Sequence, residues 1–170
     1  PPAQTQPPFW RHNRADNQLY LSSFHMARDT LPFYIGALQE FAPVELEGYA
    51  SSLYLVARYM KEHNLGGIRP RAVLTNSEML LAHQRELLEE QFACPVYDSY
   101  GAGEQAAHAS QCSQGTYHVS SELGIIEIIN GGQRVAPGEE GEIVCTGLVN
   151  LAMPLIRYRQ GDMAVLSSKT

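Results

Sequence analysis

The spacing of apolar residues over the first hundred positions switches repeatedly between two periods. Strand-like alternation or short apolar runs occur at residues 19–21, 44–49, 71–75 and 96–100. Apolar residues recur every three or four positions, as in an amphipathic helix, at residues 27–41, 53–60 and 79–92. Ser51 and Ser52 are predicted to cap the second of these helices. Strands and helices alternating in this order predict a parallel sheet with flanking helices, a βαβαβ arrangement.

The pattern changes after about residue 105. Short β-like runs occur at residues 117–119, 124–129, 141–145 and 163–166, with turn signals at Gly131-Gly132 and Pro137-Gly138. They predict a mostly antiparallel β subdomain with a hairpin between Ile129 and Glu142. The expected organisation is an extended, Pro-rich arm over 1–18, an α/β subdomain over 19–110, and a β-rich subdomain over 111–170. Phe9 and Trp10 are expected to pin the arm to the surface.

Composition narrows the classes of protein to consider. The chain has 170 residues, 44% of them hydrophobic and 18% charged, which is ordinary for a globular domain. No apolar run approaches the ~20 residues that cross a bilayer, so no membrane partner is expected and the cytoplasm is the expected compartment. A net charge of −6 with scattered basic residues disfavours a nucleic-acid partner. The three cysteines form no even disulfide framework.

One stretch, residues 96–104, combines several features of a ligand site. A strand runs into the turn Gly101-Ala102-Gly103, and Glu104 follows it. A strand that ends in such a turn is expected to leave backbone N–H groups for an anionic ligand. Tyr100 offers a flat face to a base, and Glu104 offers a hard oxygen to a divalent cation.

Two further strand ends carry polar or small residues, at 48–51 and 75–78. Because parallel sheets bind ligands at the carboxyl ends of their strands, these ends and residues 100–104 are predicted to converge on one crevice. His25 precedes the first helix and either lines this pocket or serves in packing.

Three motifs stand in a fixed order along the chain. They are Tyr-Gly-Ala-Gly-Glu at 100–104, Pro-Gly-Glu-Glu-Gly-Glu-Ile-Val at 137–144, and Met-Pro-Leu-Ile-Arg-Tyr-Arg-Gln-Gly-Asp at 153–162. Together they resemble the adenylate-forming enzymes, which include acyl-CoA synthetases, adenylation domains and luciferases. The resemblance is greatest to the phenylacetate–coenzyme A ligase and capsular-polysaccharide-synthesis branch, and it extends over nearly the whole chain.

This resemblance implies a reaction and a set of residue roles. The family joins ATP and a small-molecule carboxylate into an acyl-adenylate, releases pyrophosphate, and usually forms a coenzyme A thioester next. Mg²⁺ is needed because two anions must meet. Glu104 would be the catalytic residue that holds Mg²⁺, and Asp162 would bind the ribose. The nucleotide would also be bound by Tyr100 stacked on adenine, Gly101, Ala102, Asn76, Ser77 and Glu78. The acyl pocket would be lined by His25, Gly48, Tyr49 and Ala50.

The sequence also departs from the family. Gly103 and Gln160 stand where many relatives have a hydroxyl residue. The family's phosphate loop and its C-terminal lid with a catalytic lysine would lie before Pro1 and after Thr170. The chain is therefore expected to be the central portion of a ligase that cannot complete adenylation unaided. A noncatalytic nucleotide- or acyl-binding module of the same fold is the alternative. A dinucleotide-binding oxidoreductase is disfavoured, because the turn lacks Gly-x-Gly-x-x-Gly.

A second metal is a separate hypothesis. Cys112 and His118 flank a short turn, with His108 and Cys145 in or near the same β segment. Zinc favours thiolate and imidazole, and some relatives resemble this chain in carrying such a pair, completed by cysteines further along. The alternative is a free thiol and an unrelated strand histidine. A homo-oligomer is compatible with the sequence.

Overall fold

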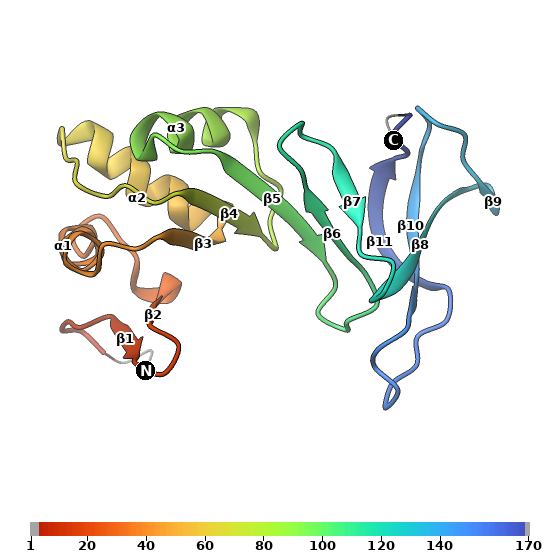
Figure 1. Ribbon diagram of the computed structural model, residues 1–170, viewed down its shortest axis with the longest axis horizontal. Coiled ribbons are helices and arrows are strands. Elements are labelled where there is room, and N and C mark those ends of the chain that lie inside the picture. The colour runs from red at the N-terminus through yellow and green to blue at the C-terminus, as the bar shows by residue number, and fades with distance from the viewer. Residues whose placement is uncertain (1–3, 169–170) are drawn as a thin grey trace. The chain divides into compact units, whose positions relative to one another are not determined.

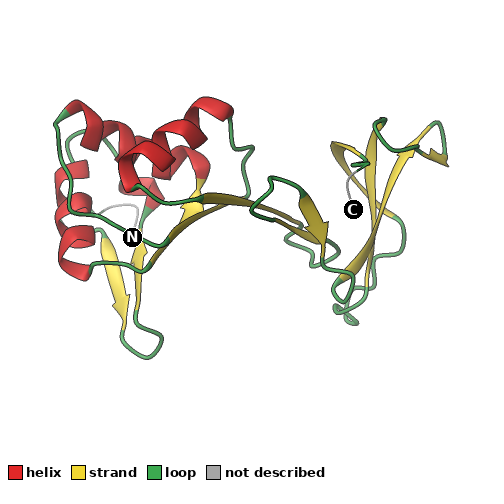
Figure 2. Cartoon of the chain, turned by 45° about the horizontal axis from the view of Figure 1, so that its top comes forward, coloured by secondary structure: helices red, strands yellow, loops and turns green. Residues whose placement is uncertain are grey.

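A computed structural model describes residues 4–168 of the chain. The polypeptide divides into two units, residues 1–96 and 97–170, and the division falls within strand β5 (Val96–Gly101). All α-helices of the described residues lie in the N-terminal unit, and the C-terminal unit consists of strands and loops (Figure 2). No helix within the described range is both long and apolar enough to cross a membrane.

The N-terminal unit alternates strands and helices, as the hydrophobic pattern predicts. Its elements are β1 (Trp10–Asn13), β2 (Gln18–Leu21), the 3-10 helix η1 (Ser23–His25), α1 (Leu31–Phe41), β3 (Glu45–Tyr49), α2 (Ala50–Glu62), β4 (Ala72–Asn76) and α3 (Ala82–Phe92) (Figure 1). β3 and β4 are parallel, with Gly48 opposite Thr75 and Tyr49 opposite Asn76. The Val73 N–H donates to the carbonyl of Pro95 (3.0 Å), so the chain leading into β5 lies beside β4. The predicted α/β class is confirmed.

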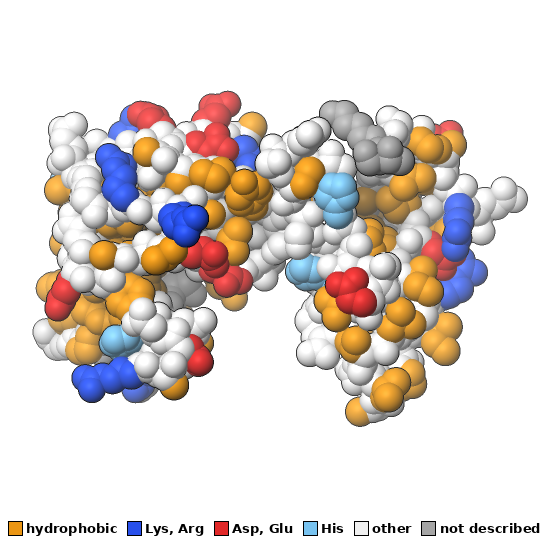
Figure 3. Space-filling view, in the orientation of Figure 1, with side chains coloured by type: hydrophobic (Ala, Val, Ile, Leu, Met, Phe, Trp, Pro, Cys, Tyr) orange, Lys and Arg blue, Asp and Glu red, His pale blue; other side chains and the backbone are white. Residues whose placement is uncertain are grey.

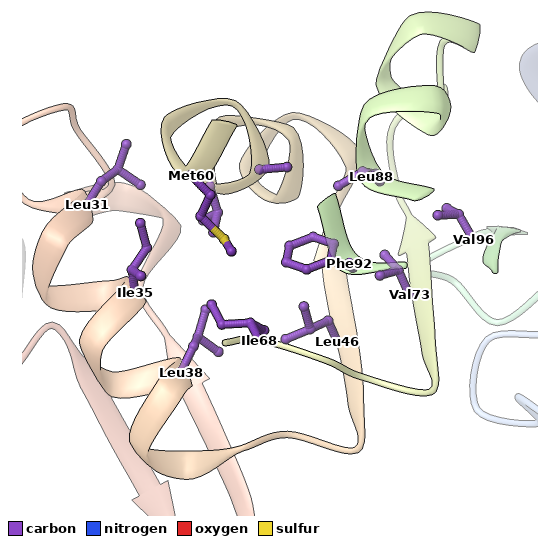
Figure 4. Packing of buried hydrophobic residues seen from close by; sticks show 12 residues of the cluster. Leu31, Ile35, Leu38, Leu46, Met60, Ile68, Val73, Leu88, Phe92 and Val96 are labelled. Carbon is purple, nitrogen blue, oxygen red and sulfur yellow. The ribbon is translucent and has the colours of Figure 1, made fainter. Parts of the chain in front are cut away.

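One apolar core joins the helices to the strands of this unit (Figure 4). Its members face one another at the spacings that predict the elements, namely Leu31, Ile35 and Leu38 of α1, Val56, Ala57 and Met60 of α2, Leu88 and Phe92 of α3, with Leu46, Ile68, Val73 and Val96. Each is less than one tenth exposed. Burial of this apolar surface is the main stabilising term for the unit.

All three helices begin at different residues from those predicted, and α3 begins at Ala82 instead of residue 79. Residues 27–30 form a turn before α1, held by the Ala27 N–H donating to Thr30 Oγ1 (2.9 Å). α2 begins at Ala50, so Ser51 lies in its first turn and is not its N-cap. The Ser51 N–H donates instead to Oε2 of Glu78 (2.9 Å), a carboxylate from the end of β4. A carboxylate at a helix N-terminus also complements the helix dipole, which explains how α2 starts without a serine cap.

Part of the predicted extended arm is a β-strand. Residues 10–13 pair antiparallel with residues 18–21. Phe9 is 5% exposed, and its ring stacks with the rings of His25 (centroids 5.2 Å apart) and Tyr34 (6.0 Å). Aromatic packing therefore anchors the arm at Phe9, in agreement with its predicted role. Pro1, Pro2 and Ala3 lie outside the described residues.

The C-terminal unit contains two antiparallel arrays. In the first, β5 pairs with β6 (His108–Gln111), which pairs with β7 (Tyr117–Val119). The second has the order β11-β10-β8-β9, formed by β8 (Gly124–Asn130), β9 (Gln133–Arg134), β10 (Glu140–Gly147) and β11 (Tyr158–Val165). Ile129 lies opposite Glu142, so the predicted hairpin is confirmed. Strand β6 has no counterpart in the sequence prediction.

Hydrophobic side chains remain on the surface of this unit (Figure 3). Many of them belong to the connection between β10 and β11, namely Leu148, Val149, Leu151, Met153 and Ile156. Leu151 is 84% exposed and Ile156 is 76% exposed. The connection thus carries apolar side chains that the described residues of the chain leave accessible.

Candidate functional site

Tyr100 and Asp162 lie together, although 62 positions separate them in the sequence. The Tyr100 hydroxyl on β5 donates to Oδ2 of Asp162 on β11 (2.8 Å). Burial raises the pKa of Tyr100 well above its usual range, and the Asp162 carboxylate raises it further. The phenol therefore stays protonated and remains a hydrogen-bond donor at neutral pH.

A bulge in β11 brings Asp162 to this position. Glu142 pairs with Met163 and Val144 pairs with Arg159, so β11 has three residues where β10 has one. Gly161, in the middle of these three, has a φ of +85°, which glycine adopts without the strain of a Cβ. Gln160 and Asp162 both contact the Tyr100 hydroxyl from this bulge.

Glu104 lies in the turn that joins β5 to β6. The Tyr158 hydroxyl donates to its Oε1 (3.3 Å), and the Asn150 side chain donates to its backbone carbonyl (3.4 Å). The Ala102 N–H donates to the carbonyl of Ala107 (3.2 Å). This amide is therefore not left for an anion, contrary to expectation, because the chain continues as an antiparallel hairpin into β6.

The β5–β6 turn packs closely against two glycines of the sheet that contains β8 and β10. Gly124 of β8 and Gly147 of β10 lie opposite each other, and both contact Ala106. A Cβ at Gly124 would come within 2.3 Å of the Ala106 carbonyl oxygen, and one at Gly147 within 3.2 Å of its Cα. The turn that carries Glu104 thus approaches Gly124 at a distance that only glycine permits, whereas a side chain at Gly147 would require a shift of a few tenths of an ångström.

The predicted residues of the N-terminal unit gather at the carboxyl ends of β3 and β4. Asn76 Nδ2 donates to Oε1 of Glu47 (3.1 Å), and Ser77 Oγ donates to Oδ1 of Asn76 (3.0 Å). Glu78 caps α2 beside Tyr49 and Ala50. Gly48 lies next to Tyr49 in β3. Their convergence with residues 100–104 on one crevice stays a prediction.

His25 serves in packing and also faces a groove. It hydrogen-bonds Ser22 Oγ through Nδ1 (2.7 Å) and stacks on Phe9. With Trp10 and Tyr20 it lines an open groove of about 410 Å³. The packing alternative is therefore observed for His25. The groove is lined by none of Gly48, Tyr49 and Ala50, so the place of His25 in the acyl pocket stays a prediction.

Cys112 and His118 are neighbours at the β6–β7 turn. N–H groups of the turn, foremost that of Gln114, lower the pKa of the Cys112 thiol to about 7, and a hydrogen bond with His118 contributes. His108 instead contacts Ser120 Oγ through Nδ1 (3.1 Å), and Cys145 is fully buried in another strand. Across residues 4–168, no three His, Cys, Asp or Glu side chains group closely enough to hold a metal. Two donors do not fit the closed four-ligand zinc site, so no step is assigned to zinc.

Sequence reasoning assigned no role to Tyr158 or Asn150, and it treated Gln160 only as a departure from the family. One signal was present in the sequence. Tyr158 precedes Asp162 by four residues, as Tyr100 precedes Glu104. The structure gives this repeated spacing a meaning, because the tyrosine of each motif contacts the carboxylate of the other.

The fold is that of a segment of the adenylate-forming acyl-CoA ligases, as the three motifs indicate. A 2-hydroxyisobutyryl-CoA ligase, solved in an open conformation with 2-HIB-AMP and CoA, superposes with a TM-score of 0.73 at 19% identity, covering 84% of this chain and 35% of that one. A benzoate CoA ligase from Burkholderia xenovorans gives 0.56 at 18% identity, covering 72% and 26% of the two chains. An anthranilate CoA ligase in complex with anthranoyl-AMP gives 0.57 at 14% identity, covering 72% and 25%.

Among curated proteins, the chain is similar to Protein CapK of Staphylococcus aureus. The two are 31% identical over 170 residues, which cover 99% of this chain and 37% of CapK. The chain therefore spans between a quarter and little more than a third of the length of these proteins, namely 25% of the anthranilate CoA ligase, 26% of the benzoate CoA ligase, 35% of the 2-hydroxyisobutyryl-CoA ligase and 37% of CapK. No protein-family model matches the chain.

Proposed function

We propose that this chain is the nucleotide- and acyl-binding part of an ATP-dependent ligase that activates a small-molecule carboxylate as its adenylate. The contact between Tyr100 and Asp162 carries the proposal, because it joins two of the three motifs, with Glu104 in the same unit. Solved proteins of this fold hold acyl-adenylates, and one of them also holds CoA. Coenzyme A is therefore the proposed acceptor in the whole protein.

Each residue has a distinct role in this proposal. Asp162 accepts hydrogen bonds from the ribose hydroxyls, a task for which a carboxylate is well suited. Tyr100 places its ring against adenine. Asn76 and Ser77 border the adenine site, and Glu78 supports it indirectly by fixing the start of α2.

Glu104 would hold Mg²⁺. Mg²⁺ in nucleotide enzymes is held by one or two carboxylates together with phosphate oxygens and water, so a single glutamate fits this donor set. The bound cation neutralises charge between the carboxylate substrate and the triphosphate. Tyr158 fixes one oxygen of the Glu104 carboxylate through its hydroxyl, while Gly48, Tyr49, Ala50 and His25 border the acyl group.

Calorimetric titration with AMP and with NAD tests the proposal. AMP is expected to bind more tightly than NAD. Asp162→Ala is expected to weaken AMP binding by about tenfold to a hundredfold, since hydrogen bonds to charged groups contribute about 1.5–3 kcal/mol. Asp29→Ala is the matched control, because Asp29 is an exposed aspartate of the other unit. A preference for NAD, or unchanged AMP binding in the Asp162 variant, would contradict the proposal.

A noncatalytic nucleotide- or acyl-binding module of the same fold is the second candidate. A measurement of pyrophosphate release from ATP in the presence of a carboxylate distinguishes a catalytic ligase from a noncatalytic binding module. We expect AMP binding without turnover by this chain alone. Turnover would show that the chain needs no further segment for adenylation.

A further inference from the structure

Two tyrosines and two carboxylates form a crossed pattern in the C-terminal unit. Tyr100 precedes Glu104 by four residues, and Tyr158 precedes Asp162 by four. Neither tyrosine hydroxyl bonds the carboxylate of its own segment in this pattern. Tyr100 donates to Asp162 (2.8 Å), and Tyr158 donates to Glu104 (3.3 Å).

We propose that Tyr100 and Tyr158 are positioning residues, and that each orients the carboxylate of the opposite motif for its ligand. Tyr100 sets the ribose-binding Asp162, and Tyr158 sets the cation-binding Glu104. The assignment of these two ligands rests on the proposed function. The crossed contacts themselves rest only on the geometry.

The chemistry of the four groups supports this role. Each tyrosine contact uses one of two carboxylate oxygens, so the second oxygen can still take a ligand atom. Asp162 is exposed, and an exposed carboxylate loses rotamer freedom when it binds a ligand. A hydroxyl that holds the carboxylate beforehand reduces this loss.

Gln160 extends the contact on the Tyr100 side. Its side chain touches the Tyr100 hydroxyl, and its Nε2 is buried with no hydrogen-bond partner among the described residues. The Tyr100 hydroxyl has one proton and can serve only one of its two acceptors. An amide turned so that Nε2 donates to the phenol oxygen gives an unbroken chain from Gln160 through Tyr100 to Asp162. Gln160 thereby directs the phenol proton toward the carboxylate.

The substitutions Tyr100→Phe and Tyr158→Phe test the proposal, because each removes a hydroxyl and keeps the ring. The first readout is the ratio of the Kd values for 2′,3′-dideoxyadenosine monophosphate and AMP. Tyr100→Phe is expected to reduce this ratio several-fold, and Tyr158→Phe to leave it unchanged. The second readout is the Mn²⁺ concentration for half-maximal ATP binding. Tyr158→Phe is expected to raise it several-fold, and Tyr100→Phe to leave it unchanged.

This crossed result separates positioning from a general structural role, which would change both readouts together. Tyr59→Phe, in the N-terminal unit, is the control and is expected to alter neither. Equal effects of the two variants on both readouts, or no effect of either, would overturn the proposal.

A ligand-free measurement keeps the inference independent of the proposed function. In protein labelled at tyrosine ¹³Cζ, the resonance of Tyr100 is assigned by its loss in the Phe variant. Asp162→Asn is expected to bring the titration midpoint of Tyr100 down toward the ordinary value of 10.0. An unchanged midpoint would overturn the inference, whereas failure of the wild type to bind AMP would count against the proposed function alone.

Discussion

Three residues of one type, the cysteines, show how local surroundings decide chemical state. N–H groups around the sulfur lower the pKa of Cys112 to about 7. Burial, followed by the charge of Asp162, raises the pKa of Cys145 to about 11. Burial and the charge of Glu89 raise the pKa of Cys94. Only the first of these thiols is therefore substantially ionised at neutral pH.

Alkylation by iodoacetamide checks this difference, because the thiolate is the nucleophile. A lowered pKa moves ionisation to lower pH, so the rate at Cys112 is expected to rise between about pH 6 and 8 and then level off. Cys94 and Cys145 are expected to react slowly over this range. His118→Asn is expected to move the midpoint upward, since it removes one hydrogen bond to sulfur. Peptide mass spectrometry follows each site, and a Cys112 rate that rises only above pH 8.5 would contradict this expectation.

Strands β8 and β10 contact the β5–β6 turn at Gly124 and Gly147, which lie opposite each other. Side chains on either strand would push Ala106 outward, and Glu104 is two residues from Ala106 in the same turn. The position of the proposed cation ligand thus depends on the absence of side chains in a sheet that is distant in sequence.

The substitution Gly124→Ala is expected to destabilise the protein by about 1–3 kcal/mol, the usual cost of an extra methyl group in a packed site. It is also expected to raise the Mn²⁺ requirement for ATP binding, because the turn must move. Gly103→Ala in the same turn is the matched control. Its Cβ would meet no atom within 4 Å, so stability is expected to change by less than about 0.5 kcal/mol. Equal melting temperatures for the two variants would argue against this account.

Helix α3 contributes to stability chiefly through its last turn, where Phe92 is fully buried against the strands. Phe92→Ala is expected to lower the free energy of unfolding by about 3–5 kcal/mol, because it leaves a cavity in the core. Glu86→Ala, on the exposed face of α3, is expected to change it by less than about 0.5 kcal/mol. Urea denaturation measures both, and a loss below about 1 kcal/mol for Phe92→Ala would contradict the described packing.

At the scale of the whole molecule, periodicity predicts much of the architecture. The spacing of Leu31, Ile35 and Leu38 indicates α1, because the same residues face the core. Tyr100, Glu104 and Asp162 could be selected from their motifs, since each motif combines turn glycines with a chemically distinctive side chain. Local sequence is informative where the determining interaction is also local.

Other features depend on partners that are distant in sequence. The start of α2 is set by Glu78 and not by Ser51, which local cap preference would choose. The bulge around Gly161 requires the register of β10 beside β11. The contact of Tyr158 with Glu104 joins residues that are 54 positions apart, so periodicity in one segment could not reveal it.

The crossed tyrosine contacts also bear on how such proteins can be recombined. In a chimera that takes residues 100–104 from one relative and residues 158–162 from another, each tyrosine contacts a carboxylate that comes from a different parent protein. Both hydroxyl contacts then join segments from different parent proteins. A mismatch in either segment therefore disturbs both ligand sites. These two short segments form one transferable module, although more than fifty residues of chain lie between them.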